Sequence, residues 1–253
     1  VWDAASAAVV AGAGVGAIAT TSSGMAAAVG YPDGQRIGRD MLVAAVARIT
    51  RVVACPVTVD IEAGYGDSVA EVAETVRAVI GAGAVGFNIE DSRPVQEGTL
   101  VDLSQQVELI RALRDLAGSL GVPYVINARV DVFLRGGSAD PAARIAEAVR
   151  RGNAYLAAGA DCVYPIGALD HATIAAVVGG TTGPVNILGG PGAPTIPELA
   201  QLGVARVSLG GRVLSALLGH LRGIAREILE QGTYDQMTAG GVAPVGLSSL
   251  YSS

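Results

Sequence analysis

A single unit recurs along the chain and constrains its fold more than any other feature. In each copy an alanine-rich amphipathic stretch runs into Ala-Gly-Ala or Leu-Gly, and a short run of β-branched residues follows. The copies occupy residues 11–23, 81–92, 156–167 and 201–211. Further strand-like runs, each started by a proline as suits the first residue of a strand, lie at 56–64, 123–133 and 184–190. The chain is therefore predicted to contain seven strands.

Helical patterns separate these strands. We expect helices at 39–53, 68–80, 104–120, 141–158, 171–178, 196–201 and 215–230. A further helix at 4–10 follows Val-Trp-Asp, which resembles the tail of an eighth strand. Strands that alternate with helices indicate a parallel α/β fold.

Two parallel architectures compete. Eight strand–helix units in 253 residues match the size of a (β/α)8 barrel, whereas a doubly wound sheet usually has fewer strands and a phosphate loop after the first one. We predict a (β/α)8 TIM-type barrel over residues 1–232, with its first strand truncated at the N-terminus. The start without methionine suggests a truncation or a leader that is not shown. Residues 233–253, rich in Gly, Ser and Pro, are expected to form a C-terminal tail that packs on a neighbouring subunit or is loosely ordered.

Composition excludes several classes of partner. The chain is 51% hydrophobic, enough for a large core, and its net charge of −6 argues against nucleic acid or an anionic membrane. The apolar stretch at 4–19 is shorter than the roughly 18 apolar residues of a membrane span and has no basic leader. Cys55 and Cys162 have apolar neighbours and no CxxC spacing, so we expect buried thiols and a cytoplasmic, reducing location.

A glycine motif at 81–86, Gly-Ala-Gly-Ala-Val-Gly, fits the GxGxxG pattern of dinucleotide binding. That pattern acts only where a strand runs into a helix, because the helix N-terminus faces the pyrophosphate. Here a helix precedes the glycines and a strand follows. We interpret the motif as a helix end and a tight turn.

The clearest functional signal is the stretch 56–67, PVTVDIEAGYGD. Residues two apart in a strand share a face, so Asp60 and Glu62 project together at the end of the strand. Two adjacent carboxylates repel, so one must be protonated or a cation must lie between them. In a (β/α)8 barrel the C-terminal strand ends form the active site, which would bring Glu90 and Arg129 to the same mouth.

Because several acids and an arginine are expected at one mouth, a functional role for them is favoured over a purely structural one. Acids at one mouth suit a hard divalent cation such as Mg²⁺ that keeps several waters, and an arginine suits a substrate carboxylate or phosphonate. Taken singly, some of these residues could have purely structural roles. Asp91 could cap a helix, Arg129 could form a salt bridge, and Asp131 could support Arg129. The same holds for Ser22 and Ser23 as turn residues, and for His171 and His220, which we take to be structural or surface residues.

Several segments resemble the isocitrate lyase/phosphoenolpyruvate mutase superfamily. They are WDAASA, TTSSGMAAAVGYPDG, VDIEAGYGD, NIEDS and the Ala-Arg-Val-Asp of 128–131, and the likeness runs from residue 1 to about 212. The resemblance implies a Mg²⁺-dependent barrel (with Mn²⁺ as an alternative) acting on 2-oxo acids or their phosphonate analogues. It also implies a homo-oligomer, dimer or tetramer, in which a C-terminal helix is exchanged between subunits.

The resemblance also implies roles for residues. Asp60 would bind the metal directly, with Glu62, Glu90 and Asp33 acting largely through metal-bound water. The substrate carboxylate would be bound by Ser22, Ser23 and Gly24. Arg129 would hold the substrate carboxylate or the departing group, and Asn186 is a further expected substrate contact. Arg129, Asp60 and Glu90 are the expected catalytic residues.

One loop departs from the superfamily pattern. Isocitrate and methylisocitrate lyases resemble one another in a loop with Lys-[KR]-Cys-Gly-His, but here SRPVQEGTLVD follows Asp91. Mutases carry Lys and Asn there, where this chain has Gln96 and Gly98. The leading hypothesis is therefore a lyase or decarboxylase for a small 2-oxo dicarboxylic acid such as oxaloacetate. The alternatives are phosphonopyruvate hydrolase or mutase chemistry, and a barrel that binds a 2-oxo acid without turning it over.

Overall fold

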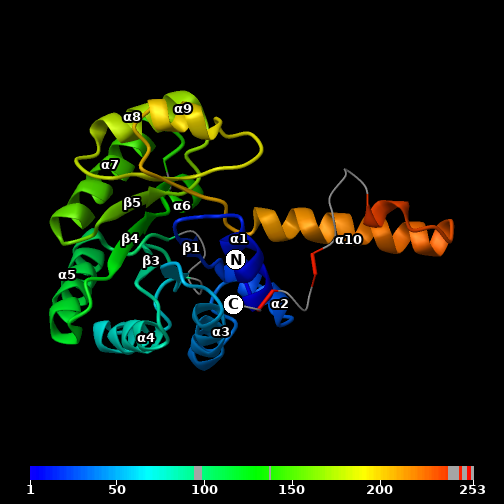
Figure 1. Cartoon of the computed structure of the whole chain (residues 1–253). Coiled ribbons are helices and arrows are strands. Elements are labelled where there is room, and N and C mark those ends of the chain that lie inside the picture. Colours follow the sequence, from blue (N-terminus) through cyan, green and yellow to red (C-terminus); the bar gives the residue numbers. More distant parts are fainter. Residues whose placement is uncertain (94–98, 137, 239–244, 247–249, 252–253) are drawn as a thin grey trace.

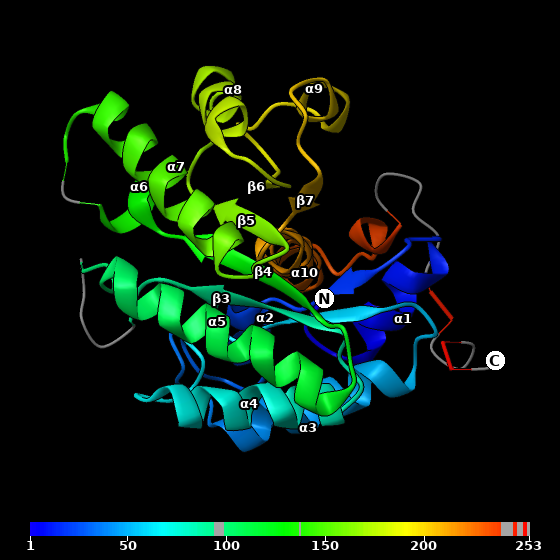
Figure 2. The ribbon, with the colours of Figure 1, turned by 90° about the vertical axis from the view of Figure 1, so that its left-hand side faces the viewer.

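A computed structural model describes residues 1–93, 99–136, 138–238, 245–246 and 250–251. It is a mixed α/β structure in which parallel strands form a curved half-barrel with helices on the outside (Figures 1 and 2). The parallel α/β architecture predicted from the sequence is thus confirmed. Closure into an eight-stranded barrel stays a prediction.

Within the described residues, seven parallel strands carry the fold, in two hydrogen-bonded groups. The first group runs in chain order through β1 (Ile18–Ala19), β2 (Val57–Asp60), β3 (Gly86–Glu90), β4 (Val125–Val130) and β5 (Cys162–Pro165). The second group pairs β6 (Asn186–Leu188) with β7 (Arg206–Ser208), and a bridge between Val163 and Val185 links the groups. Each strand lies within one of the seven predicted strand segments.

The first residue behaves like part of a further strand. The Val1 amino group donates to the Ala19 carbonyl at 2.8 Å, and the Val1 carbonyl accepts from the Thr21 N–H at 3.1 Å. These two contacts continue the ladder beyond β1, in the manner expected for the tail of a strand.

The helices begin and end close to the predicted limits. They are α1 (Ala4–Gly12), α2 (Ser22–Ala28), α3 (Arg39–Arg51), α4 (Val69–Gly81), α5 (Leu103–Leu120), α6 (Val132–Arg135), α7 (Pro141–Ala157), α8 (His171–Gly180), α9 (Ile196–Gln201), α10 (Arg212–Glu230) and the 3₁₀ turn η1 (Asp235–Met237). Capping boxes at Asp3, Ser68 and Thr195 fix three of the starts. Two short helices, α2 and α6, were not predicted, because both are too short for a periodic apolar pattern.

The core lies between the strands and the surrounding helices. In β2 the side chains of Val57 and Val59 are buried in hydrophobic clusters, whereas the alternate residues Thr58 and Asp60 are only half-buried. This alternation follows from the two-residue period of a strand, and it sends the polar side chains toward the inside of the half-barrel. The glycine motif at 81–86 spans the end of α4 and the start of β3, as predicted for a turn.

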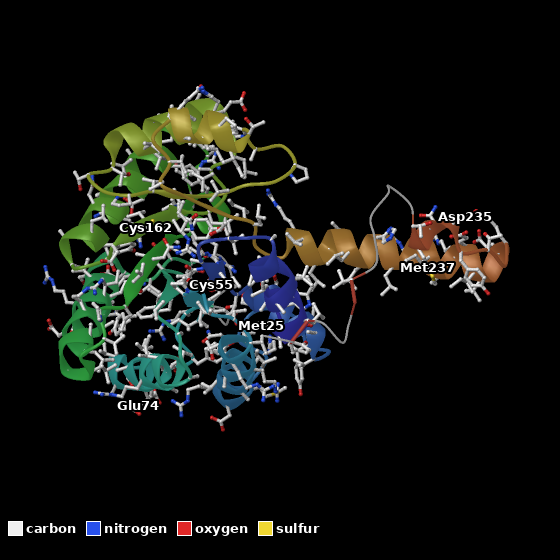
Figure 3. The ribbon with its side chains drawn as sticks, in the orientation of Figure 1. Met25, Cys55, Glu74, Cys162, Asp235 and Met237 are labelled. Atoms are coloured by element: carbon white, nitrogen blue, oxygen red, sulfur yellow. The ribbon has the colours of Figure 1, made fainter. Side chains whose placement is uncertain are left out.

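Helix α10 extends away from the rest of the molecule (Figure 1). Leu217, Leu218 and Leu221 on this helix are exposed. The described start of the predicted tail folds back on it, with Asp235 and Met237 beside the far end of the helix (Figure 3). Exchange of this helix between subunits stays a prediction. In the part of the chain that the structure describes, no helix is long and apolar enough to span a membrane.

Candidate active site

The register of the sheet aligns polar residues in one row. Glu90 pairs with Arg129, and Arg129 pairs with Tyr164. The bridge one residue earlier sets Tyr164 beside Asn186, and Asn186 pairs with Arg206. Because register partners in adjacent strands face the same side, these five side chains form one row, which runs from the C-terminal ends of β3, β4 and β5 to the first residues of β6 and β7.

Arg129 is held by carboxylates on two sides. Its Nη1 lies 2.5 Å from Glu90 Oε2, while Nε and Nη2 donate to the two oxygens of Asp131 at 2.6 and 2.9 Å. Asp131 is fully buried and also accepts from the Ser92 hydroxyl at 2.5 Å. Burial lowers the pKa of Arg129, but Glu90 and Asp131 outweigh it and raise the pKa overall. The guanidinium is therefore charged and fixed in place.

Asp60 and Glu62 lie together, next to the start of α2. The Glu62 N–H donates to Asp60 Oδ1 at 3.2 Å, and the Ser22 N–H lies 3.4 Å from Asp60 Oδ2. The Asp60 N–H donates to the Thr20 hydroxyl at 3.0 Å, which ties β2 to the end of β1. The structure thus brings the two adjacent acids to the mouth formed by the strand ends.

Two neighbours of Glu62 were missed by sequence reasoning. Glu62 Oε2 accepts from the Gln35 N–H at 2.7 Å, and Oε1 accepts from the Tyr65 hydroxyl at 2.9 Å. Gln35 Oε1 in turn accepts from the Tyr65 N–H at 2.5 Å. All three residues have positive φ, of 51° to 58°, which non-glycine residues rarely adopt. The position of Tyr65 between two glycines, just after the acids, was the available signal.

The acids act on one another electrostatically. Burial raises the pKa of Glu62 to about 7, and the charges of Asp60 and Asp33 add to this, although the hydrogen bond from Tyr65 opposes it. Burial also raises the pKa of Glu90 well above its usual value; Arg129 opposes this rise, and Asp60 and Glu62 add to it. Asp33 itself is exposed, in the loop between α2 and α3.

A divalent cation fits this donor set in one particular way. The carboxylate oxygens of Asp60, Glu62 and Glu90 are hard donors whose mutual repulsion a cation would relieve. Among the described residues, however, no three His, Cys, Asp or Glu side chains are spaced to hold an ion by themselves. Both oxygens of Glu62 already accept protein hydrogen bonds. The residues therefore suit an ion with few direct protein ligands and several waters, as Mg²⁺ prefers.

The predicted carboxylate-binding residues form the first turn of α2. The Ser23 hydroxyl lies 3.1 Å from that of Thr21. A Cβ added at Gly24 would lie 2.7 Å from Thr21 Cγ2, and one at Gly211 would lie 2.7 Å from Ser23 Oγ. The turn before α10 therefore packs against this segment with no space for side chains. Substrate binding by Ser22, Ser23 and Gly24 stays a prediction.

Of the remaining polar residues, Asn186 lies in the row at the mouth, whereas Asp91 has a structural role. Asn186 is buried, and its Nδ2 donates to the Ser208 hydroxyl at 2.9 Å. Asp91 does not cap α5, a role taken by Asp102; it accepts instead from the Asp131 N–H and the Tyr155 hydroxyl, both at 2.8 Å. Asp91 is thus a structural residue that supports Asp131.

The other open residues lie away from the mouth or outside the described part of the chain. His171 and His220 are exposed on α8 and α10. Cys162, labelled in Figure 3, is buried in β5, and Cys55 is half-buried before β2. Gln96 and Gly98 lie outside the residues that the structure describes.

A curved parallel sheet wrapped by helices, with acids and a buried arginine at its C-terminal strand ends, defines the class as an α/β protein of the TIM type. Within that class, the family model described as phosphoenolpyruvate phosphomutase matches residues 1–229. The chain therefore belongs to the phosphoenolpyruvate phosphomutase family, in the isocitrate lyase/PEP mutase superfamily. The resemblance found in the sequence is confirmed.

Relatives within the superfamily differ in their described activities. An uncharacterized protein of Mycobacterium tuberculosis (strain ATCC 25618 / H37Rv) is 37% identical over 215 residues, which cover 85% of this chain and 77% of that protein. The oxaloacetate decarboxylase of Rhodopseudomonas palustris (strain BisB18) is 31% identical, over 90% of this chain and 74% of that enzyme. A crystal structure from Burkholderia cenocepacia J2315, provisionally described as a phosphonomutase, is 41% identical with a TM-score of 0.85, over 89% of this chain and 91% of that one.

Proposed function

We propose that the protein is a Mg²⁺-dependent carbon–carbon lyase that decarboxylates, or otherwise cleaves, a small 2-oxo dicarboxylic acid of the oxaloacetate type. The observation that carries this proposal is the fixed, charged Arg129 beside the acids Asp60, Glu62 and Glu90. An anionic substrate needs a cation on the protein, and a 2-oxo acid offers two oxygens suited to a bound metal. The similarity to oxaloacetate decarboxylase supports the same choice.

Each residue has a defined task in this reaction. Asp60 would ligate Mg²⁺, or Mn²⁺ in its place, with Glu62, Glu90 and Asp33 contacting its waters. The bound cation would neutralise the negative charge that develops on the 2-oxo group as the C3–C4 bond breaks. Arg129 would hold the departing carboxylate, and the α2 turn at Ser22–Gly24 would hold the other. Asn186 lies in the same row and would border the substrate.

The test is turnover with a control for uncatalysed loss of CO₂. Purified protein is incubated with oxaloacetate and Mg²⁺, and CO₂ release is compared with Mg²⁺ alone and with Asp60→Ala protein. We expect release well above both controls, abolished by a chelator. Release equal to that with Mg²⁺ alone, for oxaloacetate and its 3-alkyl derivatives, would contradict the proposal.

Carbon–phosphorus chemistry is the second candidate, favoured by the 41% identity to the Burkholderia protein. The same arginine and acids could serve phosphonopyruvate, because a phosphonate is also an anion that arginine binds bidentately. Incubation with phosphonopyruvate separates the two: inorganic phosphate indicates hydrolysis, and phosphoenolpyruvate indicates mutation.

We also infer that the protein forms a homo-oligomer, a dimer or a tetramer. Leu217, Leu218 and Leu221 leave an apolar face of α10 exposed, and such faces are usually covered by another protein surface. Sedimentation of the full chain would test this, and a monomer at micromolar concentration would contradict it.

A further inference from the structure

The proposed decarboxylation requires a proton donor. The identity of that donor is inferred below and rests on the proposed function. When the C3–C4 bond breaks and CO₂ leaves, the electron pair stays on the substrate and C3 must be protonated. The usual donors are scarce here. The chain contains no lysine, and its two histidines lie on exposed helix surfaces. Cys162 lies two residues before Tyr164 on β5, so its thiol is deeper in the half-barrel than the row of Glu90 and Arg129.

The acids at the mouth are already engaged in ion pairs or hydrogen bonds with other protein groups. Glu90 is paired with Arg129, and both carboxylate oxygens of Glu62 accept hydrogen bonds from Gln35 and Tyr65. A group that donates a proton to a carbon atom must present an unshared O–H or N–H to the substrate. Among the described residues, Tyr164 meets this requirement.

Tyr164 occupies the centre of the polar row. On one side, Tyr164 pairs with Arg129 of β4. On the other side, the bridge between Val163 and Val185 sets it next to Asn186 of β6. The residue is 4% exposed, yet its hydroxyl has no hydrogen-bond partner within the described part of the chain. The charges of Arg129, Asp60, Arg206 and Arg212 all act on that hydroxyl, although they come from different strands and from the start of α10. The hydroxyl therefore lies where several strand ends converge.

Other buried tyrosines behave differently. The Tyr155 hydroxyl donates to Asp91 at 2.8 Å, and the Tyr124 hydroxyl donates to the Leu113 carbonyl. Tyr164 is buried as a residue, but its hydroxyl oxygen is not among the described polar atoms that are enclosed without a partner. The hydroxyl therefore reaches solvent at the inside of the half-barrel, where a bound ligand could accept its hydrogen bond.

We propose that Tyr164 is a catalytic residue that delivers the proton to C3 of the enolate left by CO₂ loss. The phenolic O–H bond breaks, the C3–H bond forms, and the phenolate remains on the protein. Burial raises the pKa of Tyr164, so the phenol holds its proton until the enolate forms, and the guanidinium groups of Arg129, Arg206 and Arg212 oppose that rise. Water then restores the phenol after the 2-oxo product leaves, so that atoms and charge balance over the cycle.

Stereochemistry provides the test, because a fixed donor protonates one face of the enolate. Protein with Mg²⁺ decarboxylates 3-methyloxaloacetate in D₂O, and the 2-oxobutyrate formed is reduced at once to preserve its configuration at C3. Wild-type protein should give one C3-deuterated configuration in large excess. Tyr164→Phe should give an almost racemic product, with kcat lowered at least tenfold and KM changed less than threefold.

A matched control separates the chemistry from the loss of a buried hydroxyl. Tyr124→Phe also removes a buried phenol oxygen, but away from the mouth, and should keep the stereochemistry and the rate. Calorimetry with oxalate and Mg²⁺ should show that Tyr164→Phe still binds a dicarboxylate, which establishes that the site is folded.

The outcomes distinguish two failures. A racemic product from wild-type protein, or an unchanged configuration and rate in Tyr164→Phe, would overturn the role of Tyr164 and leave the proposed lyase activity standing. Absence of any decarboxylation by wild-type protein would overturn the proposed function, and the role of Tyr164 with it.

Discussion

Arg129 on β4 and Glu90 on β3 form an ion pair of 2.5 Å across neighbouring strands, at the level where the sheet opens. Glu90 is 8% exposed, so the pair is largely shielded from water. A buried pair of this kind is costly to break from one side, because the remaining charge has no compensation. The same contact therefore bears on both stability and function.

Removal of the guanidinium should destabilise the protein strongly. Arg129→Met leaves Glu90 and Asp131 without their partner, so we expect the free energy of unfolding to fall by about 3–5 kcal/mol. Urea denaturation of the full chain measures this. Arg150→Met is the matched control, because Arg150 forms an exposed pair with Glu147 and should change stability by about 1 kcal/mol or less. Equal losses in the free energy of unfolding for the two substitutions would show that the buried ion pair contributes no more to stability than the exposed one.

Loss of Asp60 should remove metal binding without loss of the fold. In Asp60→Ala, calorimetric titration with Mg²⁺ or Mn²⁺ should show no binding, and metal-dependent turnover should vanish. The far-UV circular dichroism should be unchanged, because Asp60 is half-buried and accepts only two backbone hydrogen bonds. Asp115→Asn, an exposed acid on α5, should bind metal normally. An unchanged rate in Asp60→Ala would contradict the metal site.

The raised pKa of Glu62 predicts how metal-free stability depends on pH. Its pKa is 4.5 in an unfolded chain and about 7 when folded, so the folded state holds the proton more tightly. This contribution is present below pH 4.5 and is lost as the pH rises through 7, an effect of about 3 kcal/mol. Thermal melts with chelator should show the loss, and Glu62→Gln should flatten it. Wild-type stability that rises over the same interval in parallel with Glu62→Gln would be inconsistent with this assignment.

The hydroxyl of Tyr65 should tune the site through Glu62. Tyr65→Phe removes the 2.9 Å hydrogen bond to Glu62 Oε1, which favours the charged carboxylate. Metal affinity should fall about tenfold, as for other groups that orient a carboxylate near a metal. Calorimetry with Mn²⁺ measures this, with the exposed Tyr31→Phe in the neighbouring loop as control. Equal affinities in the two variants would exclude an orienting role.

Cys162 should be unreactive in the folded protein. Burial raises the pKa of its thiol from 9.0 to about 11, so at pH 8 the reactive thiolate is about 100-fold rarer than in the unfolded chain. Peptide mapping after a short treatment with iodoacetamide should find Cys162 labelled in urea and unlabelled in buffer. Cys162→Ser and Cys55→Ser should keep the activity. Rapid native labelling of Cys162 would place it on an accessible surface instead.

Much of the site could be predicted because it depends on strand order and period. Asp60 ends β2, and Glu90 and Arg129 follow at the ends of the next two strands. The two-residue period does not place Glu62, which lies beyond β2 with a φ of 51°, so a turn brings it next to Asp60. The structural roles of Asp91 and Asp131 were settled only by their side-chain contacts, and those of Asp91 join residues distant in sequence. Asp131 supports Arg129, and Asp91 accepts from Asp131 and Tyr155 instead of capping a helix.

The amino-acid sequence by itself determined the alternation of strands and helices, the end of the sheet at which the acids gather, and the family. These properties follow from local periodicity and from short motifs. Only the tertiary structure decided that Gln35 and Tyr65 fix Glu62, and that Tyr164 stands beside Arg129 with an unused hydroxyl. Such relationships depend on sheet register and on the close approach of loops, and neither is written in the spacing of residues along one chain.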